Sequence, residues 1–162
     1  MKTLLVYYSN NKKMQEMCEA SAKSGDVDVV RLYERYNKGL LWDATIGTCR
    51  AIGGIGSKFQ DIDINMAEYD NLIIATPVRL LNPHSVINEF LHRTSLMDVR
   101  VSALLIHTGG IIGAAADILR KRIYLAGGCC RGVVSISTRE LKEKKCDAVS
   151  LAKVKTKVPV TA

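Results

Sequence analysis

Three short polar segments carry the residue types that could bind a ligand, and each one follows an apolar run. The first holds a hydroxyl, two amides and two amines: Ser9, Asn10, Asn11, Lys12 and Lys13. The second spans residues 76–82 and the third spans residues 107–113. A helix is expected to begin at the first segment, where unpaired N–H groups and the positive end of the helix dipole favour negative charge. We therefore expect any bound anion at residues 9–13.

The cysteines and histidines do not form a recognisable metal or redox motif. The five cysteines, Cys18, Cys49, Cys129, Cys130 and Cys146, contain no CxxC pair. The histidines, His84, His92 and His107, are not at metal-ligand spacing. Cys18 lies on a predicted apolar helix face, and Cys129 and Cys130 lead into a predicted strand, so we expect buried, reduced thiols. No general acid, base or nucleophile stands out, which agrees with chemistry carried by a cofactor.

The composition is that of one domain with its own core. The chain has 162 residues and 48% apolar content, which suits a single domain over residues 1–162. It has no run of about eighteen apolar residues that could span a bilayer. Its start lacks the longer apolar core and cleavage site of a signal peptide. We therefore expect a cytoplasmic protein with no membrane contact.

The charge favours an anionic ligand or partner, because the net charge is +7. Nucleic acid is not indicated, since basic blocks interleaved with aromatic residues are absent and aromatics make up 6% of the chain. Residues 139–157 hold seven basic and three acidic side chains. This basic segment is interpreted either as a solvated surface or as part of the attraction for an anionic partner.

Apolar patterns predict alternating strands and helices. Strands are expected at residues 3–8, 26–32, 72–75, 99–106 and 132–137. The first helix has an apolar stripe made of Met14, Met17, Cys18 and Ser21, and Gly25 is expected to end it. A second helix carries Val86, Ile87, Phe90 and Leu91 on one face, and a third spans residues 111–126 before Gly127 and Gly128. Weaker patterns predict helices at residues 40–52 and 147–156.

The segment 69–83 organises the predicted sheet. Its run 72–75 is apolar without alternation, so both faces of that strand are expected to be covered. Thr76–Pro77 is expected to end the strand, because proline supplies no N–H to a central strand. Asn82 can cap the helix that follows, and Pro83 fits its first turn.

The order of these elements predicts an α/β fold. Buried strands that alternate with helices indicate a three-layer, doubly wound sheet of five parallel strands with helices on both faces. Ligands bind such sheets at the loops that follow the carboxyl ends of the strands. The glycine cluster at residues 53–56 follows no predicted strand and lacks the ending of a P-loop, so a helix end and a turn are expected there.

The sequence resembles the flavodoxin family. The resemblance rests on residues 4–9 (LLVYYS), 69–78 (YDNLIIATPV), 82–83 (NP), 107–110 (HTGG) and 132–137 (GVVSIS), and it covers residues 1–140. It implies the strand order 2-1-3-4-5, with FMN at the carboxyl ends of strands one, three and four. Residues 36–59 are similar to an insertion found in flavodoxin-like reductases.

The resemblance also implies which residues contact FMN. In the first loop they are Ser9, Asn10, Asn11, Lys12, Lys13 and Met14. In the second loop they are Thr76, Pro77, Val78, Arg79, Leu80 and Asn82. In the third loop they are His107, Thr108, Gly109 and Gly110, and the two glycines are expected to form a tight turn near the ring edge.

The first loop departs from the family pattern, because it lacks the glycine and threonines that usually wrap the FMN phosphate. Two interpretations follow. Asparagine and lysine side chains form a phosphate site of altered geometry, or Asn10 or Asn11 simply caps the first helix.

The other two loops lack the usual stacking aromatic. Arg79 stands where an aromatic residue is common in the family. It is interpreted either as a neighbour of the flavin or as a surface charge. Leu80 and Leu81 could pack on the ring instead. His107 lies at a strand end, and its role is interpreted either as structural or as functional.

Two functional hypotheses result. The first is an FMN-binding, flavodoxin-like redox protein, either an electron carrier or a small NAD(P)H-dependent reductase. Its partners would be a redox protein or NAD(P)H, and a homodimer is compatible with it. The second is a flavodoxin-fold binding or interaction module that has lost FMN. A receiver-type signalling domain is set aside, because the expected aspartates are absent after residues 8 and 75.

Overall fold

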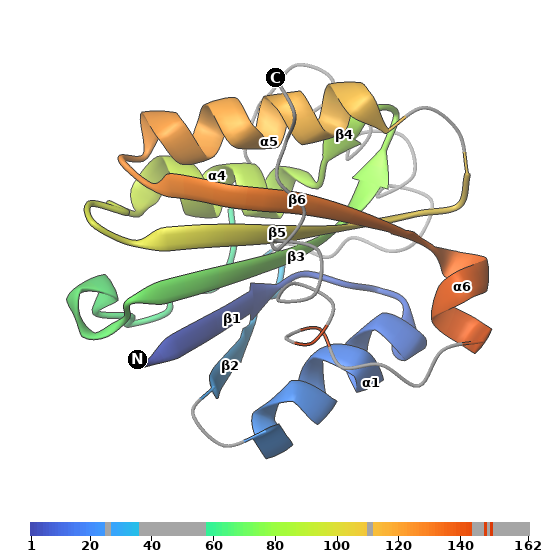
Figure 1. Cartoon of the computed structure of the whole chain (residues 1–162), viewed down its shortest axis with the longest axis horizontal. Coiled ribbons are helices and arrows are strands. Elements are labelled where there is room, and N and C mark those ends of the chain that lie inside the picture. The colour runs from blue at the N-terminus through green and yellow to red at the C-terminus, as the bar shows by residue number, and fades with distance from the viewer. Residues whose placement is uncertain (25–26, 36–57, 110–111, 144–147, 149, 151–162) are drawn as a thin grey trace.

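The computed structural model describes residues 1–24, 27–35, 58–109 and 112–143, together with Ala148 and Ser150. Five parallel strands lie in the order β2-β1-β3-β5-β6, and β4 pairs antiparallel with β3 (Figure 1). The strands are β1 (Thr3–Tyr7), β2 (Val27–Arg31), β3 (Asn71–Arg79), β4 (Asn82–Pro83), β5 (Arg100–His107) and β6 (Cys129–Ser137). With the short β4 set aside, this is the predicted five-stranded parallel sheet in the order 2-1-3-4-5.

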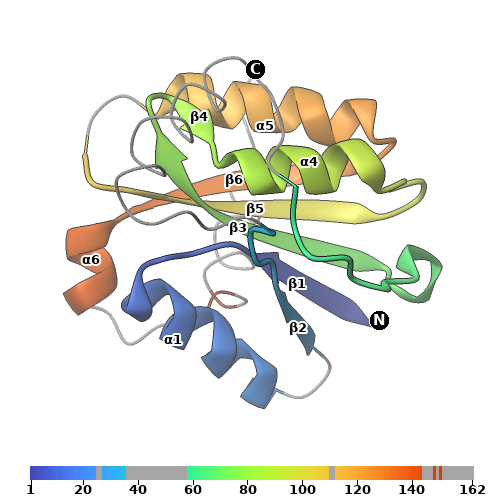
Figure 2. The ribbon, with the colours of Figure 1, turned by 180° about the vertical axis from the view of Figure 1, so that it is seen from behind.

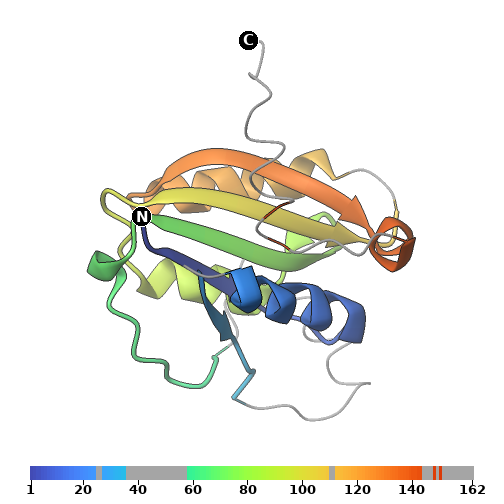
Figure 3. The ribbon, with the colours of Figure 1, turned by 60° about the horizontal axis from the view of Figure 1, so that its bottom comes forward.

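Helices cover both faces of the sheet. They are α1 (Lys12–Ala20), α4 (Ser85–Arg93), α5 (Gly113–Leu125) and α6 (Thr138–Glu143), with 3-10 turns at Ser21–Ser24 and Met66–Glu68. The helices α4 and α5 lie side by side on one face, and α1 and α6 lie on the other (Figures 2 and 3). The predicted helix 40–52 and the glycine cluster 53–56 lie outside the described residues, as does most of the predicted helix 147–156.

The core has two halves, one on each side of β3. Leu72 and Ile74 pack toward α4 and α5, whereas Ile73 and Ala75 pack toward α1 and α6. All four side chains are buried. The expectation that residues 72–75 are covered on both faces is confirmed, and it explains why this run does not alternate with polar residues.

The prediction that Thr76–Pro77 ends the strand is wrong, because β3 continues to its hairpin. The carbonyl of Ala75 faces β1 and accepts the N–H of Tyr8 at 3.2 Å. Two residues further on, Pro77 faces the same side, where β1 has already ended. Its missing N–H therefore breaks no ladder, and Pro77 still pairs in register with Ile106 of β5.

Asn82 and Pro83 do not begin the next helix, which corrects a second prediction. They form β4 and pair with the end of β3. The helix α4 begins at Ser85, and His84 is its N-cap residue. Since β3 runs on past its proline, the chain needs a turn and a return strand before the helix can start.

The remaining elements follow the predicted pattern closely. The predicted stripe is buried: Met14, Met17 and Cys18 lie on α1, and Ser21 begins the 3-10 turn that follows it. The expected terminator Gly25 lies outside the described residues. Gly127 ends α5 with a φ of +87°, a conformation that favours glycine. The short helix α6 was not predicted, because its six residues are too few to carry a clear apolar period.

The thiols differ in exposure, so the expectation of uniformly buried cysteines is only partly correct. Cys18 is buried in the α1 face of the core, and burial raises the pKa of its thiol to about 12. Cys129, at the start of β6, is exposed. Cys49 and Cys146 lie outside the described residues.

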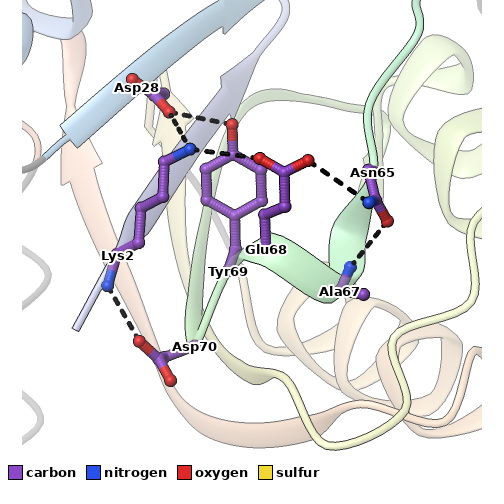
Figure 4. Close-up of polar contacts among 7 residues, drawn as sticks. All are labelled: Lys2, Asp28, Asn65, Ala67, Glu68, Tyr69 and Asp70. Atoms are coloured by element: carbon purple, nitrogen blue, oxygen red, sulfur yellow. Dashed lines mark hydrogen bonds and ion pairs between the residues drawn. The ribbon is translucent and has the colours of Figure 1, made fainter.

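A polar network ties the first three strands together at the amino end of the sheet (Figure 4). Lys2 Nζ lies 3.3 Å from Asp28 Oδ2 and 3.4 Å from Glu68 Oε2, and it sits 4.6 Å above the Tyr69 ring. The Tyr69 hydroxyl donates to Asp28 Oδ2 at 2.9 Å. The backbone N–H of Lys2 donates to Asp70 Oδ2 at 2.8 Å. These contacts fix β2 and the turn before β3 against β1.

This network predicts a specific acid sensitivity. Hydrogen bonds from Tyr69 and Lys2, with the positive charge of Lys2, hold the pKa of Asp28 below its usual range. The ionised carboxylate therefore stabilises the folded state at pH values above the ordinary pKa of an aspartate, and that stabilisation is lost as the pH falls through the lowered folded-state pKa. We expect the melting temperature of Asp28→Asn to fall less between neutral and acid pH than that of the wild type. The exposed Asp63→Asn variant is the matched control, and a wild-type pH profile in Asp28→Asn would contradict the prediction.

Candidate functional site

A cavity of about 550 Å³ lies where the loops after β1, β3 and β5 meet. We call it the loop cavity. Predicted site residues that line it are Ser9, Asn10, Asn11, Met14, Pro77, Val78, Arg79, Leu80, His107 and Thr108. The others that the structure describes do not line it: Lys12, Lys13, Thr76, Asn82 and Gly109. Gly110 lies outside the described residues.

Three lining residues were not predicted: Tyr8, Ile106 and Thr138. Each of them stands at the carboxyl end of a strand, which is the edge where the predicted loops meet. Strand ends were therefore the signal that could have found them. Thr138 follows β6, and no binding loop was predicted after that strand.

Side chains of the first loop accept hydrogen bonds from the backbone N–H groups at the start of α1. Asn11 Oδ1 accepts the N–H of Lys13 at 2.9 Å and that of Met14 at 3.3 Å. Ser9 Oγ accepts the N–H of Asn11 at 2.9 Å. Of the two interpretations left open above, capping by Asn11 is the one present in this structure. An anion at this helix end must compete with the Asn11 side chain for those donors.

Arg31 at the end of β2 holds the first loop in place. Its Nη2 donates to the Ser9 carbonyl at 3.1 Å, and Gln15 Nε2 donates to the same oxygen at 2.9 Å. Arg31 Nη1 also donates to Gln15 Oε1 at 3.2 Å. The lysines of this loop lie outside the cavity, and Lys13 pairs with Glu16 at 3.1 Å. Arg31 is therefore an anchor of the loop that the sequence did not reveal.

The second loop is a tight hairpin with unusual turn residues. Leu80 and Leu81 connect β3 to β4, with φ values of 43° and 64°. Two-residue turns with positive φ at both positions normally hold Asn-Gly or a similar pair, because a Cβ is strained in that conformation. Both leucines are exposed, at 59% and 48%, so burial does not offset this strain. The turn presents an apolar pair at the rim of the loop cavity, and Leu80 lines it.

A stacked ring pair joins the first loop to the start of α4. The rings of Tyr8 and His84 are 4.0 Å apart and nearly parallel, at 18°. Asn10 Nδ2 donates to the Tyr8 hydroxyl at 3.3 Å. His84 Nδ1 accepts the N–H of Val86 at 3.4 Å. Burial, with the nearby charge of Arg79, lowers the pKa of His84 to about 3, so its ring is neutral.

The third loop leaves β5 with a change of direction at Gly109. Its φ of +139° is one that residues with a Cβ rarely adopt. A Cβ built on Gly109 would meet no atom within 4 Å, so the constraint there is conformational. His107 and Thr108 line the loop cavity just before this turn, and His107 Nδ1 is buried without a hydrogen-bond partner among the described residues.

Within the described part of the chain, no group of three or more His, Cys, Asp or Glu side chains could hold a metal ion. None of the helices described is long and apolar enough to cross a membrane. The chemistry that this site can offer is the binding of a ligand between three loops, with hydroxyl, amide and guanidinium groups on an otherwise apolar wall.

The sheet order and the loop cavity at the carboxyl ends of its strands define a flavodoxin-like fold. No family model matches the sequence, and no curated protein is similar to it at the level of sequence. Solved structures do match.

The flavoprotein from Lactobacillus acidophilus NCFM in complex with FMN is 20% identical, with a TM-score of 0.69 over 83% of this chain and 92% of its own. The two-electron reduced flavodoxin of Megasphaera elsdenii is 18% identical, with a TM-score of 0.56 over 96% and 99%. An NADPH-quinone reductase from P. pentosaceus is 8% identical, with a TM-score of 0.61 over 98% and 100%.

Proposed function

We propose that this chain binds FMN in the loop cavity and works as a flavodoxin-like redox protein. The observation that carries the proposal is the position of the loop cavity, at the carboxyl ends of β1, β3 and β5 in a flavodoxin-like sheet. FMN supplies electron-transfer chemistry when it is bound. The protein supplies the binding wall, the exclusion of water and the local charge.

The residues of the loop cavity fit the two parts of FMN unequally. Its volume of about 550 Å³ suits a ligand of this size, and Val78 and Leu80 give the ring an apolar wall. Asn10 and Thr138 present an amide and a hydroxyl group to the phosphate, whereas the Ser9 hydroxyl already bonds the backbone of Asn11. The helix N–H groups are available to the phosphate only if the Asn11 side chain turns away.

The Asn11 cap also favours a second candidate function. A flavodoxin-fold module that has lost FMN would keep the same cavity and would use its own side chains to satisfy the start of α1. Titration of the purified, cofactor-free protein with FMN separates the two candidates. We expect saturable quenching of flavin fluorescence at one FMN per chain. Absence of saturation, with the protein folded by circular dichroism, would leave the binding module as the function.

Two uses of a bound flavin follow, and a short assay distinguishes them. A reductase takes a hydride from NAD(P)H, whereas an electron carrier needs a redox partner protein. We propose the carrier, because the apolar, exposed Leu80–Leu81 turn at the rim suits docking of a protein surface. Oxidation of NADPH by the FMN-loaded protein and a small quinone, without any other enzyme, would support the reductase instead. The homodimer and the cytoplasmic location stay predictions.

Gly109 gives a first test of the third loop. Gly109→Val is expected to weaken FMN binding, because valine does not readily adopt a φ of +139° and must pull the loop out of position. Unfolding should remain cooperative, since the side chain itself meets no neighbour within 4 Å. Gly113→Val, at the start of α5 and also in open space, is the control. FMN affinity equal to that of the wild type in Gly109→Val would remove this loop from the site.

Arg79 gives a test of the local charge. A positive side chain beside the flavin favours the reduced, more negative state, so Arg79→Gln is expected to lower the midpoint potential of bound FMN. Because the arginine is partly exposed, the shift should be on the order of tens of millivolts. Arg100→Gln is the matched control for charge, because Arg100 lies at the amino end of β5, far from the carboxyl end that lines the loop cavity. Potentiometric titration of the three proteins makes the comparison, and an equal or higher potential in Arg79→Gln would refute it.

A further inference from the structure

The edge of the sheet at which the loop cavity opens carries an exposed apolar turn. Leu80 and Leu81 connect β3 to β4, and both side chains are exposed. Leu80 lines the loop cavity, whereas Leu81 does not. The Leu81 side chain is therefore left for a molecule that approaches this edge from the solvent.

The backbone of this turn indicates a role beyond the stability of the fold. Leu80 and Leu81 hold φ values of 43° and 64°, a region that is unfavourable for a residue with a Cβ. The pairing of Val78 with Pro83 and of Arg79 with Asn82 closes the hairpin around them. Backbone strain of this kind is concentrated at functional sites. An apolar pair that is exposed and held in a closed hairpin suits the centre of a protein–protein interface.

Basic side chains share this edge with the leucine turn. The start of α1, the β3–β4 hairpin and α6 all lie at the same edge of the sheet (Figure 1). Lys12 and Lys13 begin α1, Arg79 ends β3, and Arg139 lies in the first turn of α6. None of the residues that line the loop cavity is a carboxylate.

The carboxylates of these segments leave the edge with a positive charge. Residues 8–16, 76–84 and 137–141 hold four basic side chains and two carboxylates, Glu16 and Glu140. Glu16 pairs with Lys13 at 3.1 Å. Glu140 Oε2 accepts the N–H of Ser137 at 2.9 Å, at the start of α6. A positive edge attracts a negative surface and raises the rate at which the two meet.

The arrangement of these groups favours a protein as the partner over a membrane. The apolar part is a turn of two residues, and the basic side chains are divided among three separate segments. Membrane surfaces attract contiguous basic clusters and larger apolar faces. An apolar centre with charged groups around it is the usual anatomy of a protein–protein interface.

We propose that this edge docks a small electron-transfer protein that has an acidic surface. The inference rests on the proposed function as an electron carrier, because docking here brings the partner to the mouth of the loop cavity. Leu80 and Leu81 form the centre of the interface, and Lys12, Arg79 and Arg139 pair with carboxylates of the partner. In the docked pair a reduced metal centre of the partner loses one electron and the bound flavin gains it, and no bond forms or breaks.

The test is isothermal calorimetry of the full chain, with and without FMN, against a plant-type ferredoxin, which is a small acidic protein with a [2Fe–2S] cluster. Cytochrome c, a small basic redox protein, is the control for the sign of the charge. We expect ferredoxin to bind at one per chain and cytochrome c not to bind. An increase in NaCl from about 20 mM to about 300 mM should weaken the binding of ferredoxin about tenfold or more.

Matched variants test the apolar centre and the charge separately. Leu81→Asn should weaken ferredoxin binding about tenfold, because it removes an apolar side chain from the centre of the interface. Asparagine accepts a positive φ and Leu81 does not line the loop cavity, so the fold and the FMN affinity should be unchanged. Tyr124→Asn, at an exposed position near the end of α5, is the control. Lys12→Gln should weaken ferredoxin binding about threefold, and Lys23→Gln, in the 3-10 turn beyond the other end of α1, should not.

Ferredoxin binding that weakens with salt, in Leu81→Asn and in Lys12→Gln, with both control variants unchanged, supports the proposal. Absence of saturable ferredoxin binding overturns it, as does equal binding of cytochrome c or equal binding by Leu81→Asn. Tighter binding to vesicles that contain phosphatidylserine than to ferredoxin would identify a membrane as the partner and would also overturn it. The two proposals fail differently: a chain that binds no FMN refutes the proposed function, whereas an FMN-loaded chain that binds no ferredoxin refutes the docking alone.

Discussion

The paired substitution Leu80→Asn with Leu81→Gly is expected to stabilise the fold while it weakens FMN binding. Both leucines hold positive φ values, 43° and 64°, in a turn where Asn-Gly is the favoured pair. Relief of that strain should raise the free energy of unfolding by about 1–2 kcal/mol in total. Little apolar burial is lost, because the two side chains are 59% and 48% exposed. Urea denaturation measures the gain.

The same substitution is expected to weaken FMN binding in the loop cavity. Leu80 is part of its apolar wall, so its replacement should loosen the contact with the flavin ring. The double variant Leu80→Ala with Leu81→Ala separates the two effects, because it removes the side chains but keeps a Cβ at both strained positions. That control should bind FMN weakly without any gain in stability. A wild-type free energy of unfolding in the Asn-Gly variant would contradict the assignment of strain to this turn.

Asn11→Gly is expected to tighten FMN binding, although it removes a helix cap. The Asn11 side chain occupies the N–H groups of Lys13 and Met14, which a phosphate at this helix end would need. Glycine at an N-cap costs only a few tenths of a kcal/mol of stability, less than alanine does. Freeing those donors should be worth about 1 kcal/mol of binding, or roughly a fivefold lower Kd.

Riboflavin is the control for this second prediction, because it has the flavin ring and lacks the phosphate. Its affinity should be the same in Asn11→Gly and in the wild type. Fluorescence titrations of both proteins with both flavins give the four constants. If FMN and riboflavin change together, the effect comes from the loop as a whole. If the FMN affinity falls, the Asn11 side chain is a ligand of the phosphate instead of a competitor.

The sheet was predictable because its signal is local and strong. The unbroken apolar run 72–75 can be stable only when it is buried on both faces, and that requirement already specifies a layered parallel sheet. The edge at which the loops meet follows from the same reasoning, since parallel strands place all their carboxyl ends together. For that reason ten predicted residues do line the loop cavity.

The predictions that were wrong or missing depend on contacts between residues that are far apart in the sequence. Whether Pro77 ends a strand depends on which flank its missing N–H would face. On that flank the pairing of β3 with β1 has already ended at Ala75, so no ladder bond of that pair is lost. The left-handed turn at Leu80–Leu81 does not follow the usual preference for Asn-Gly in such turns, so the sequence pattern did not predict it. The roles of His84 and Arg31 rest on contacts with Tyr8 and Ser9 across the fold.

The most direct test of the central claim is NMR mapping of the backbone amides as FMN is added to the cofactor-free protein. If FMN binds in the loop cavity, the shifts should saturate at one equivalent and should concentrate at Tyr8, Val78 and Thr108, one residue from each of the three loops. The amide of Leu125, at the carboxyl end of α5 and outside the loop cavity, should not shift. Absence of saturable shifts, or shifts that leave these three loops unchanged, would contradict the account.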